Sequence, residues 1–317
     1  MLIADSTGPG FALAAGIKQY LAEKCDCDVP LINVEKKTFK DGEFKLKISD
    51  NIRRKKCFLI HDSNKLPCDW LAELAFALEA MTFSSPEEIN VVLPYLRFAR
   101  QERKDESRIS VNAKVVADIV SLYATRGITV DLHAPQVQEY FQIPFDNLYS
   151  FPMLIYYLKE FHPEILENLV VVSPDLGGGK RAEALAKRLQ KIGVNAEIAF
   201  GHKTKVRDNE VEKVMIIGDV CGKNCLVVDD IIDTGGTMIK TAEVLRNAGA
   251  KTVYAYGTHG LFTQGTDRFK VFDKVIVSDT LKSPEGSNVE VLSLVGLFGE
   301  AIYRIVRGES LSVLFDK

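Results

Sequence analysis

Short apolar runs alternate along the chain with longer segments in which apolar residues recur at helical spacing. In the first half, apolar runs occupy 57–60, 89–93 and 128–132, and helical patterns near 69–81 and 112–123 separate them. Continuous apolar runs are typical of strands buried on both faces, and their alternation with helices predicts a parallel sheet covered by helices.

The same rhythm recurs after residue 145. It predicts strands at 169–173, 196–200, 226–228, 252–257 and 274–278, and helices near 180–190 and 237–248. We therefore expect an α/β protein with two tandem domains of similar size, 1–147 and 148–317, each a mainly parallel sheet flanked by helices.

Three segments depart from this alternation. Residues 203–212 are almost wholly polar, which predicts an exposed hairpin or a mobile loop. Residues 36–48 alternate as a strand pair does, with Asp41-Gly42 as the turn. Apolar residues over 291–306 recur at helical spacing, and they predict a long helix that packs back on the first domain.

Composition and charge narrow the functional class. The 317 residues are 46% hydrophobic and 26% charged, which is typical of an ordered globular protein. A net charge of -3 gives no overall attraction to nucleic acid or to an anionic membrane, so an anionic ligand requires a local cluster of cations. Six cysteines without metal-ligand spacing, and no signal or membrane-length apolar segment, indicate reduced thiols in a cytoplasmic protein.

The clearest chemical motif is segment 225–237, which reads Cys-Leu-Val-Val-Asp-Asp-Ile-Ile-Asp-Thr-Gly-Gly-Thr. A buried strand delivers Asp229 and Asp230 to its carboxyl end, where α/β sheets bind ligands. The loop that follows begins a helix with small and hydroxylated residues, namely Asp233, Thr234, Gly235, Gly236 and Thr237. Backbone N–H groups, hydroxyls and the helix N-terminus suit a phosphate monoester, while the two carboxylates suit sugar hydroxyls or a divalent cation.

An isolated Asp-Asp pair usually indicates an acidic turn exposed to solvent rather than a binding site. The motif here is longer and follows a strand, which favours a binding site. It resembles the phosphoribosyl diphosphate motif of type I phosphoribosyltransferases and of ribose-phosphate pyrophosphokinases. Four further segments separate these two families: 94–103 (Pro-Tyr-Leu-Arg-Phe-Ala-Arg-Gln-Glu-Arg), 130–138 (Val-Asp-Leu-His-Ala-Pro-Gln-Val-Gln), 172–179 (Val-Ser-Pro-Asp-Leu-Gly-Gly-Gly) and 217–220 (Ile-Gly-Asp-Val). In order and spacing they resemble ribose-phosphate pyrophosphokinases, over essentially the whole chain.

These segments also make chemical sense by themselves. Residues 97–108, called here the arginine segment, contain five cations suited to a polyphosphate: Arg97, Arg100, Arg103, Lys104 and Arg108. A run of cations is also compatible with a solvated helix face. A lone histidine at a strand end, such as His133, is also compatible with a structural role. The glycine turn 173–179 suits a diphosphate or a tight turn, and 177–181 lacks the spacing of a P-loop.

The resemblance implies two tandem phosphoribosyltransferase-type domains and a reaction of ATP with ribose 5-phosphate, giving 5-phosphoribosyl 1-diphosphate and AMP. It places the 5-phosphate at Asp233–Thr237, with Asp229 and Asp230 facing the ribose and Mg²⁺. It implies that Arg100, Gln101 and Arg103 hold ATP and that His133 and Asp175 meet the magnesium nucleotide. The catalytic residues that it implies are Lys203, Lys205 and His133. Phe39, Asp41 and Glu43 match the adenine-contacting segment that the family donates from a neighbouring subunit, which implies a homo-oligomer with a shared ATP site.

Two other functions stay open. One is a phosphoribosyltransferase, which the arginine segment and His133 disfavour. The other is a non-catalytic regulatory homologue, which is expected to have lost catalytic groups that this chain retains. Lys205 also stands where the family usually has arginine. No nucleic acid or membrane partner is expected.

Overall fold

The computed structural model describes residues 1–204, 213–282 and 288–316, and the chain forms two compact units. Unit 1 consists of Met1–Ser150, Thr280–Lys282 and Leu294–Asp316, and unit 2 consists of Phe151–Asp279 with the described part of Ser283–Ser293. Each unit contains one seven-stranded sheet. No helix in the described ranges is both long enough and apolar enough to cross a bilayer.

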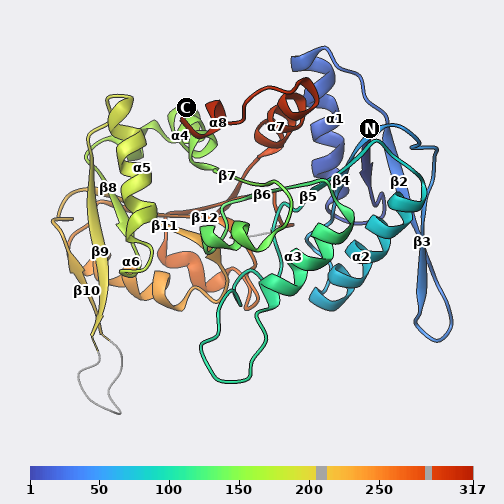
Figure 1. The fold of residues 1–317 in the computed structure, drawn as a ribbon. Coiled ribbons are helices and arrows are strands. Elements are labelled where there is room, and N and C mark those ends of the chain that lie inside the picture. Colours follow the sequence, from blue (N-terminus) through green and yellow to red (C-terminus); the bar gives the residue numbers. More distant parts are fainter. Residues whose placement is uncertain (205–212, 283–287, 317) are drawn as a thin grey trace. The chain divides into compact units, whose positions relative to one another are not determined.

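Unit 1 is a mainly parallel sheet with strand order β3-β2-β1-β4-β5-β6-β7, in which only β2 and β3 pair antiparallel (Figure 1). Its elements are β1 (Leu2–Ala4), α1 (Phe11–Cys25), β2 (Leu31–Thr38), β3 (Phe44–Ile48), β4 (Lys56–Ile60), α2 (Pro67–Phe83), β5 (Glu88–Val92), α3 (Asn112–Tyr123), β6 (Arg126–Val130), the 3-10 helix η1 (Pro135–Tyr140), β7 (Phe145–Leu148), α7 (Val295–Arg307) and α8 (Val313–Asp316).

Helical periodicity produces the buried faces of this unit. In α2, Pro67 occupies the first turn, where its missing N–H has no cost, and Trp70, Leu74 and Leu78 form a fully buried stripe. The final helix α7 can pack closely on α1 because Gly299 has no side chain. A Cβ added to Gly299 would lie 2.5 Å from Tyr20 Cδ1.

Unit 2 has the corresponding order β10-β9-β8-β11-β12-β13-β14, and only β9 and β10 pair antiparallel. Its elements are α4 (Phe151–Phe161), η2 (Pro163–Leu166), β8 (Leu169–Ser173), α5 (Gly179–Lys191), β9 (Ala196–Thr204), β10 (Lys213–Ile217), β11 (Asn224–Ile232), α6 (Gly236–Asn247), β12 (Thr252–Gly260), η3 (Asp267–Val271), β13 (Lys274–Ser278) and β14 (Val289–Leu292). Every residue of β8 is buried, as expected of a strand covered on both faces.

The expected fold class, two mainly parallel sheets flanked by helices, is confirmed. One element prediction is wrong in part: residues at the start of 291–306 belong to β14, and α7 begins only at Val295. Val291 pairs with Val277 of β13, so this apolar residue belongs to a strand and not to the helix. All six cysteines are free thiols; Cys57 and Cys225 are buried, and Cys68 and Cys221 are exposed.

Candidate active site

The carboxyl ends of neighbouring strands bring three loops to one edge of unit 2. β8 lies between β9 and β11, and both pairs are parallel. The register aligns Val227 with Val172, and Ser173 with Phe200, so the strands reach the same level of the sheet. Open α/β sheets bind ligands at this edge, which is where the predicted motif lies.

Two carboxylates and one guanidinium meet at this edge. Asp229 and Asp230 lie near the end of β11, and Arg181 lies in the first turn of α5. Arg181 Nη1 is 2.9 Å from Asp229 Oδ1, and Nη2 is 2.9 Å from Asp230 Oδ1. The side chain of Asp230 is 3% exposed and that of Asp229 is 29% exposed, so Asp229 is the carboxylate that a ligand can reach.

The electrostatics of the pair favour an additional cation or hydrogen-bond donor. Burial is the largest factor that raises the pKa of Asp229 above the usual range of aspartate. The neighbouring Asp230 raises this pKa further, and the Arg181 guanidinium opposes the rise only in part. One guanidinium therefore does not fully offset two carboxylates. Carboxylate oxygens are ligands that a divalent cation prefers, but no group of three or more potential metal-ligating side chains meets anywhere in the described part of the chain.

The loop that follows β11 forms an open cradle at the N-terminus of α6. Gly235 has a φ of 69°, and an added Cβ would lie 2.3 Å from Phe269 Cζ, so only glycine fits there without strain. Beside it, an added Cβ on Gly236 would meet no atom within 4 Å. The Thr263 hydroxyl donates a hydrogen bond to Asp233, which holds the start of the loop. Thr234 and Thr237 lie in the same turn, and no side chain caps the helix.

A second turn, between β8 and α5, lies at the same edge. The Gly178 N–H donates to Asp175 Oδ1 at 3.0 Å, and Ser173 Oγ donates to the Asp175 carbonyl at 2.6 Å. These bonds order a short glycine turn at the N-terminus of α5, a form suited to an anion. The backbone of Lys203 lies on β9, opposite Val214 of the antiparallel strand β10. Lys205 and the rest of the expected hairpin or loop, 205–212, lie outside the described residues.

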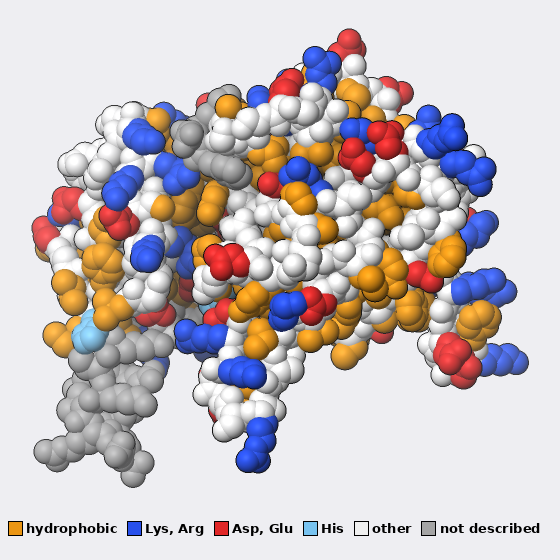
Figure 2. Space-filling model, in the orientation of Figure 1, with side chains coloured by type: hydrophobic (Ala, Val, Ile, Leu, Met, Phe, Trp, Pro, Cys, Tyr) orange, Lys and Arg blue, Asp and Glu red, His pale blue; other side chains and the backbone are white. Residues whose placement is uncertain are grey.

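In unit 1, the arginine segment and His133 both lie at the carboxyl ends of strands in the sheet. The segment follows β5 and His133 follows β6, and these two strands are parallel neighbours. Arg100, Arg103 and His133 are exposed. Gln101 Nε2 donates to the Arg103 carbonyl at 3.2 Å, which shapes the turn. Figure 2 shows Lys and Arg side chains gathered on the loop that projects after β5.

Arg97 differs from the other cations of the segment. Its Nε donates to the Ser63 carbonyl at 3.0 Å, and its guanidinium lies 5.8 Å from the Tyr95 ring centre. Burial lowers the pKa of Arg97. Arg97 therefore supports the loop, and the exposed cations are the ones available to an anionic ligand.

The chain does not bring all predicted ATP residues together. Phe39, Asp41 and Glu43 form the tip of the β2–β3 hairpin, where the Glu43 N–H donates to Asp41 Oδ1 at 3.1 Å. In the strand order β2-β1-β4-β5, this hairpin is three positions from the strand that precedes the arginine segment. At ~4.8 Å per strand, the separation is about 14 Å within the sheet alone.

Comparisons with known proteins give the family. The profile described as the N-terminal domain of ribose phosphate pyrophosphokinase matches residues 8–123, and that of the phosphoribosyl synthetase-associated domain matches 201–316. The ribose-phosphate pyrophosphokinase of Chlorobaculum tepidum is 41% identical over 321 aligned residues, which cover 99% of this chain and 94% of that protein. The chain belongs to the ribose-phosphate pyrophosphokinase family. The relationship expected from the motifs is thereby confirmed.

Other members of the ribose-phosphate pyrophosphokinase family agree with this assignment. The enzyme of Agrobacterium fabrum is 40% identical, covering 96% of each chain. The crystal structure of phosphoribosylpyrophosphate synthetase from Mycobacterium smegmatis matches with a TM-score of 0.85 and 31% identity, covering 97% of this chain and 99% of that one.

Arg181 is the site residue that sequence reasoning missed. The sequence indicates only that 177–181 lacks the spacing of a P-loop. In the structure, the last residue of this stretch, Arg181, bridges Asp229 and Asp230. The available signal was its position, because a cation in the first turn after a strand and glycine loop lies at the ligand edge of the sheet. Its two partners are 48 and 49 residues away, so only the fold identifies them.

Proposed function

We propose that this enzyme transfers the diphosphoryl group of ATP to the anomeric hydroxyl of ribose 5-phosphate, giving 5-phosphoribosyl 1-diphosphate and AMP. The observation that carries this proposal is the juxtaposition of the Asp229–Asp230 pair with the open cradle at Gly235 and Gly236. A ribose phosphate offers both the hydroxyls and the phosphate that such an edge recognises. The names of the related enzymes support the same reaction.

The substrate is placed by the chemistry of the cradle. The 5-phosphate lies at Asp233–Thr237, where the N–H groups of α6 and the helix dipole favour an anion. Asp229, the more exposed carboxylate, accepts hydrogen bonds from ribose hydroxyls. Arg181 keeps both carboxylates oriented, and in this role it is a positioning residue.

Mg²⁺ fits the same residues by the nature of the donors. It prefers oxygen ligands, and the raised pKa of Asp229 reports negative charge that a divalent cation would relieve. Asp229 and Asp230 would hold the ion at the ribose, and by resemblance Asp175 and His133 would meet the ion carried by the nucleotide. When bound, Mg²⁺ would neutralise charge on the diphosphate as it is transferred.

The cationic side chains act on the phosphates of ATP. The anomeric oxygen forms a bond to the β-phosphorus while the bond to the bridging α,β oxygen breaks, so AMP leaves with that oxygen and the hydroxyl proton passes to solvent. Arg100 and Arg103 hold the phosphates, and Lys203 and Lys205 offset the charge that develops between the β-phosphate and AMP.

We infer that ATP binding requires a second copy of the chain. The strand β2, which leads into the hairpin of Phe39, Asp41 and Glu43, lies three strand positions from β5, or about 14 Å at ~4.8 Å per position. A hairpin tip contributed by a neighbouring subunit removes this separation. The proposal is therefore a homo-oligomer in which each ATP site is shared, and mixing Phe39→Ala subunits with Arg100→Ala subunits should restore part of the activity that each variant lacks alone.

The direct test is AMP formation from ATP and ribose 5-phosphate with Mg²⁺ and no nucleobase, followed by ³¹P NMR of the product. The paired variant Gly236→Ala places a methyl group in the open cradle, so it should raise the KM for ribose 5-phosphate about tenfold and leave the KM for ATP unchanged. Consumption of 5-phosphoribosyl 1-diphosphate with a nucleobase would instead indicate a phosphoribosyltransferase. Absence of both reactions in folded protein would indicate a regulatory homologue.

A further inference from the structure

Unit 1 contains a cavity at the amino-terminal end of its sheet, whereas the arginine segment follows the carboxyl end of a strand. It lies at the amino ends of β1 and β4, beside the end of α1 and the last turns of α7, and its volume is about 460 Å³. The predicted ATP residues lie after the carboxyl ends of β5 and β6, or on the β2–β3 hairpin, so the cavity shares no residue with them.

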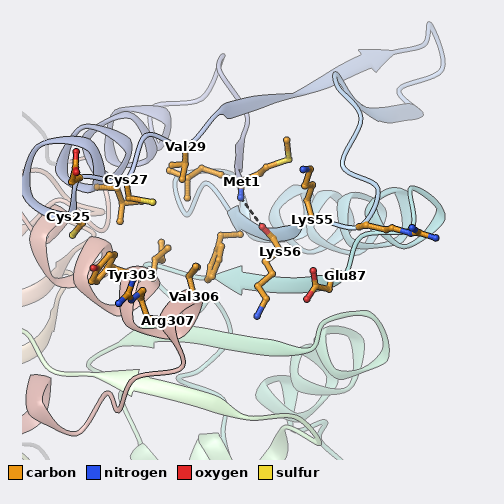
Figure 3. Close-up of a pocket in the computed structure, with 16 residues that line it drawn as sticks. Met1, Cys25, Cys27, Val29, Lys55, Lys56, Glu87, Tyr303, Val306 and Arg307 are labelled. Carbon is orange, nitrogen blue, oxygen red and sulfur yellow. Dashed lines mark hydrogen bonds between the residues drawn. The ribbon is translucent and has the colours of Figure 1, made fainter.

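The floor of the cavity is apolar and consists of buried side chains. Leu2, Leu21, Phe58 and Ile302 line it, and each is at most 2% exposed. Figure 3 shows Cys27 and Val29, which follow α1, facing Tyr303 and Val306 of α7 across the cavity. A volume in the range of about 300 to 1,000 Å³ with predominantly apolar walls is typical of a small-molecule site.

Cations outnumber acids around this floor. Four basic side chains line the cavity, namely Arg54, Lys55, Lys56 and Arg307, against two acidic ones, Asp26 and Glu87. Lys56 pairs with Glu88 at 2.8 Å, and Arg307 Nε lies 3.7 Å from Glu309 Oε1. Arg54 and Lys55 form no ion pair with any described residue.

The backbone nitrogen of Met1 also borders the cavity. It donates a hydrogen bond to the Lys56 carbonyl at 2.8 Å (Figure 3). An apolar floor with positive charge at its border is complementary to a molecule that is apolar at one end and anionic at the other.

We propose that this cavity binds a small amphipathic anion, with an apolar ring system or short chain against Leu21, Phe58 and Ile302 and one carboxylate, sulfonate or phosphate at a charged end of the cavity, near Lys55 or near Arg307. The proposal is independent of the diphosphoryl transfer reaction, because it uses none of the residues assigned to that reaction.

The test compares two fluorescent probes that differ only in charge. 8-Anilinonaphthalene-1-sulfonate carries a sulfonate on the same rings as neutral N-phenyl-1-naphthylamine. Titrated into the full chain, the sulfonate should bind with one-to-one saturation and about fivefold more tightly than the neutral probe. The Lys55→Ser/Arg307→Ser variant should lose this preference. The control Lys24→Ser changes an exposed residue of α1 that does not line the cavity, and it should retain the preference.

A second measurement locates the probe. Cys25 and Cys27 line the cavity, whereas Cys68 and Cys221 are exposed elsewhere. Bound sulfonate should slow alkylation of the first two by iodoacetamide, measured by peptide mass spectrometry, and leave the other two unchanged. The proposal would be overturned if the double variant kept the wild-type preference for the sulfonate, if Cys25 and Cys27 were not protected, or if ATP displaced the probe.

Discussion

Replacing Arg181 by methionine tests how the carboxylate pair is held. The change keeps a long apolar stem but removes the guanidinium that lies 2.9 Å from both Asp229 and Asp230. Charge centres about 4 Å apart interact by about 4 kcal/mol at an effective dielectric of 20. Arg181 is 22% exposed and its desolvation offsets part of this attraction, so about 2 kcal/mol is a reasonable net loss.

This loss should appear mainly as a change in protonation. A net 2 kcal/mol corresponds to about 1.5 pKa units, which adds to the rise that burial and Asp230 already cause in the pKa of Asp229. If ionised Asp229 is needed for ribose 5-phosphate, the acidic limb of the kcat/KM profile should move upward by more than about one pH unit. Activity should then fall about tenfold or more at pH 7 and recover in part at pH 9.

The assay is AMP formation at varied ribose 5-phosphate across this pH range. Arg181→Lys keeps one positive charge and should show an intermediate shift. Lys187→Met is the matched control, because it removes an exposed cation of the same helix whose one ion pair with a described residue is to Glu183. A loss of equal size at every pH, with an unmoved limb, would refute the electrostatic role of Arg181.

Three further changes test separate parts of the structure. Lys203→Ala should lower kcat about a hundredfold with unchanged melting temperature, and wild-type turnover would contradict the assignment. Gly235→Ala should destabilise unit 2 by about 2 to 4 kcal/mol in urea unfolding, because its Cβ meets Phe269, while Gly236→Ala is the near-neutral control. Burial alone would raise the pKa of Glu290, but hydrogen bonds from Lys274, His162 and Tyr157 lower it to about 2. Glu290→Gln should therefore cost about 2 kcal/mol at pH 7, and this difference should shrink as pH falls from about 4.5 towards 2; a difference independent of pH would argue against it.

Much of the fold could be predicted because local pattern and burial agree. The strand at 169–173 and the helix at 112–123 coincide with β8 and α3, where a continuous apolar run and a clear helical stripe leave little ambiguity. The error at 291–306 has a physical origin. Apolar spacing does not distinguish an edge strand from a helix over a few residues, and pairing with β13 decides the outcome.

The candidate site, like the fold, could be predicted only in part. Asp229, Asp230 and the cradle were predictable because they lie on one continuous segment after a strand. Arg181 was not, because its role depends on α5 being placed beside β11. The distance of the Phe39 hairpin from the arginine segment depends on strand order, which local sequence does not determine.

The two sheets share one strand order, so the fold by itself does not explain why unit 2 has the open ligand edge. The loop before α2 in unit 1 corresponds to the cradle before α6, since both follow the fourth strand of their sheet. In unit 1, Asp62 Oδ1 accepts hydrogen bonds from the N–H and the side-chain amide of Asn64, at 2.9 and 2.7 Å.

The neighbouring turn of unit 1 is closed by its own side chains too. Lys65 Nζ bridges Asp5 and Glu73, each at 2.6 Å, and the Asp62 carboxylate packs so closely on Gly8 that an added Cβ would lie 2.2 Å from Oδ2. The equivalent position in unit 2 has open space beside Gly236 and a carboxylate pair that one guanidinium does not fully offset. The same architecture is thus closed by its own side chains in one unit, where only Asp62 Oδ2 is a buried carboxylate oxygen of this turn without a hydrogen-bond partner among the described residues, and left open in the other, where we propose that ribose phosphate binds. The chemistry therefore depends on side chains rather than on topology.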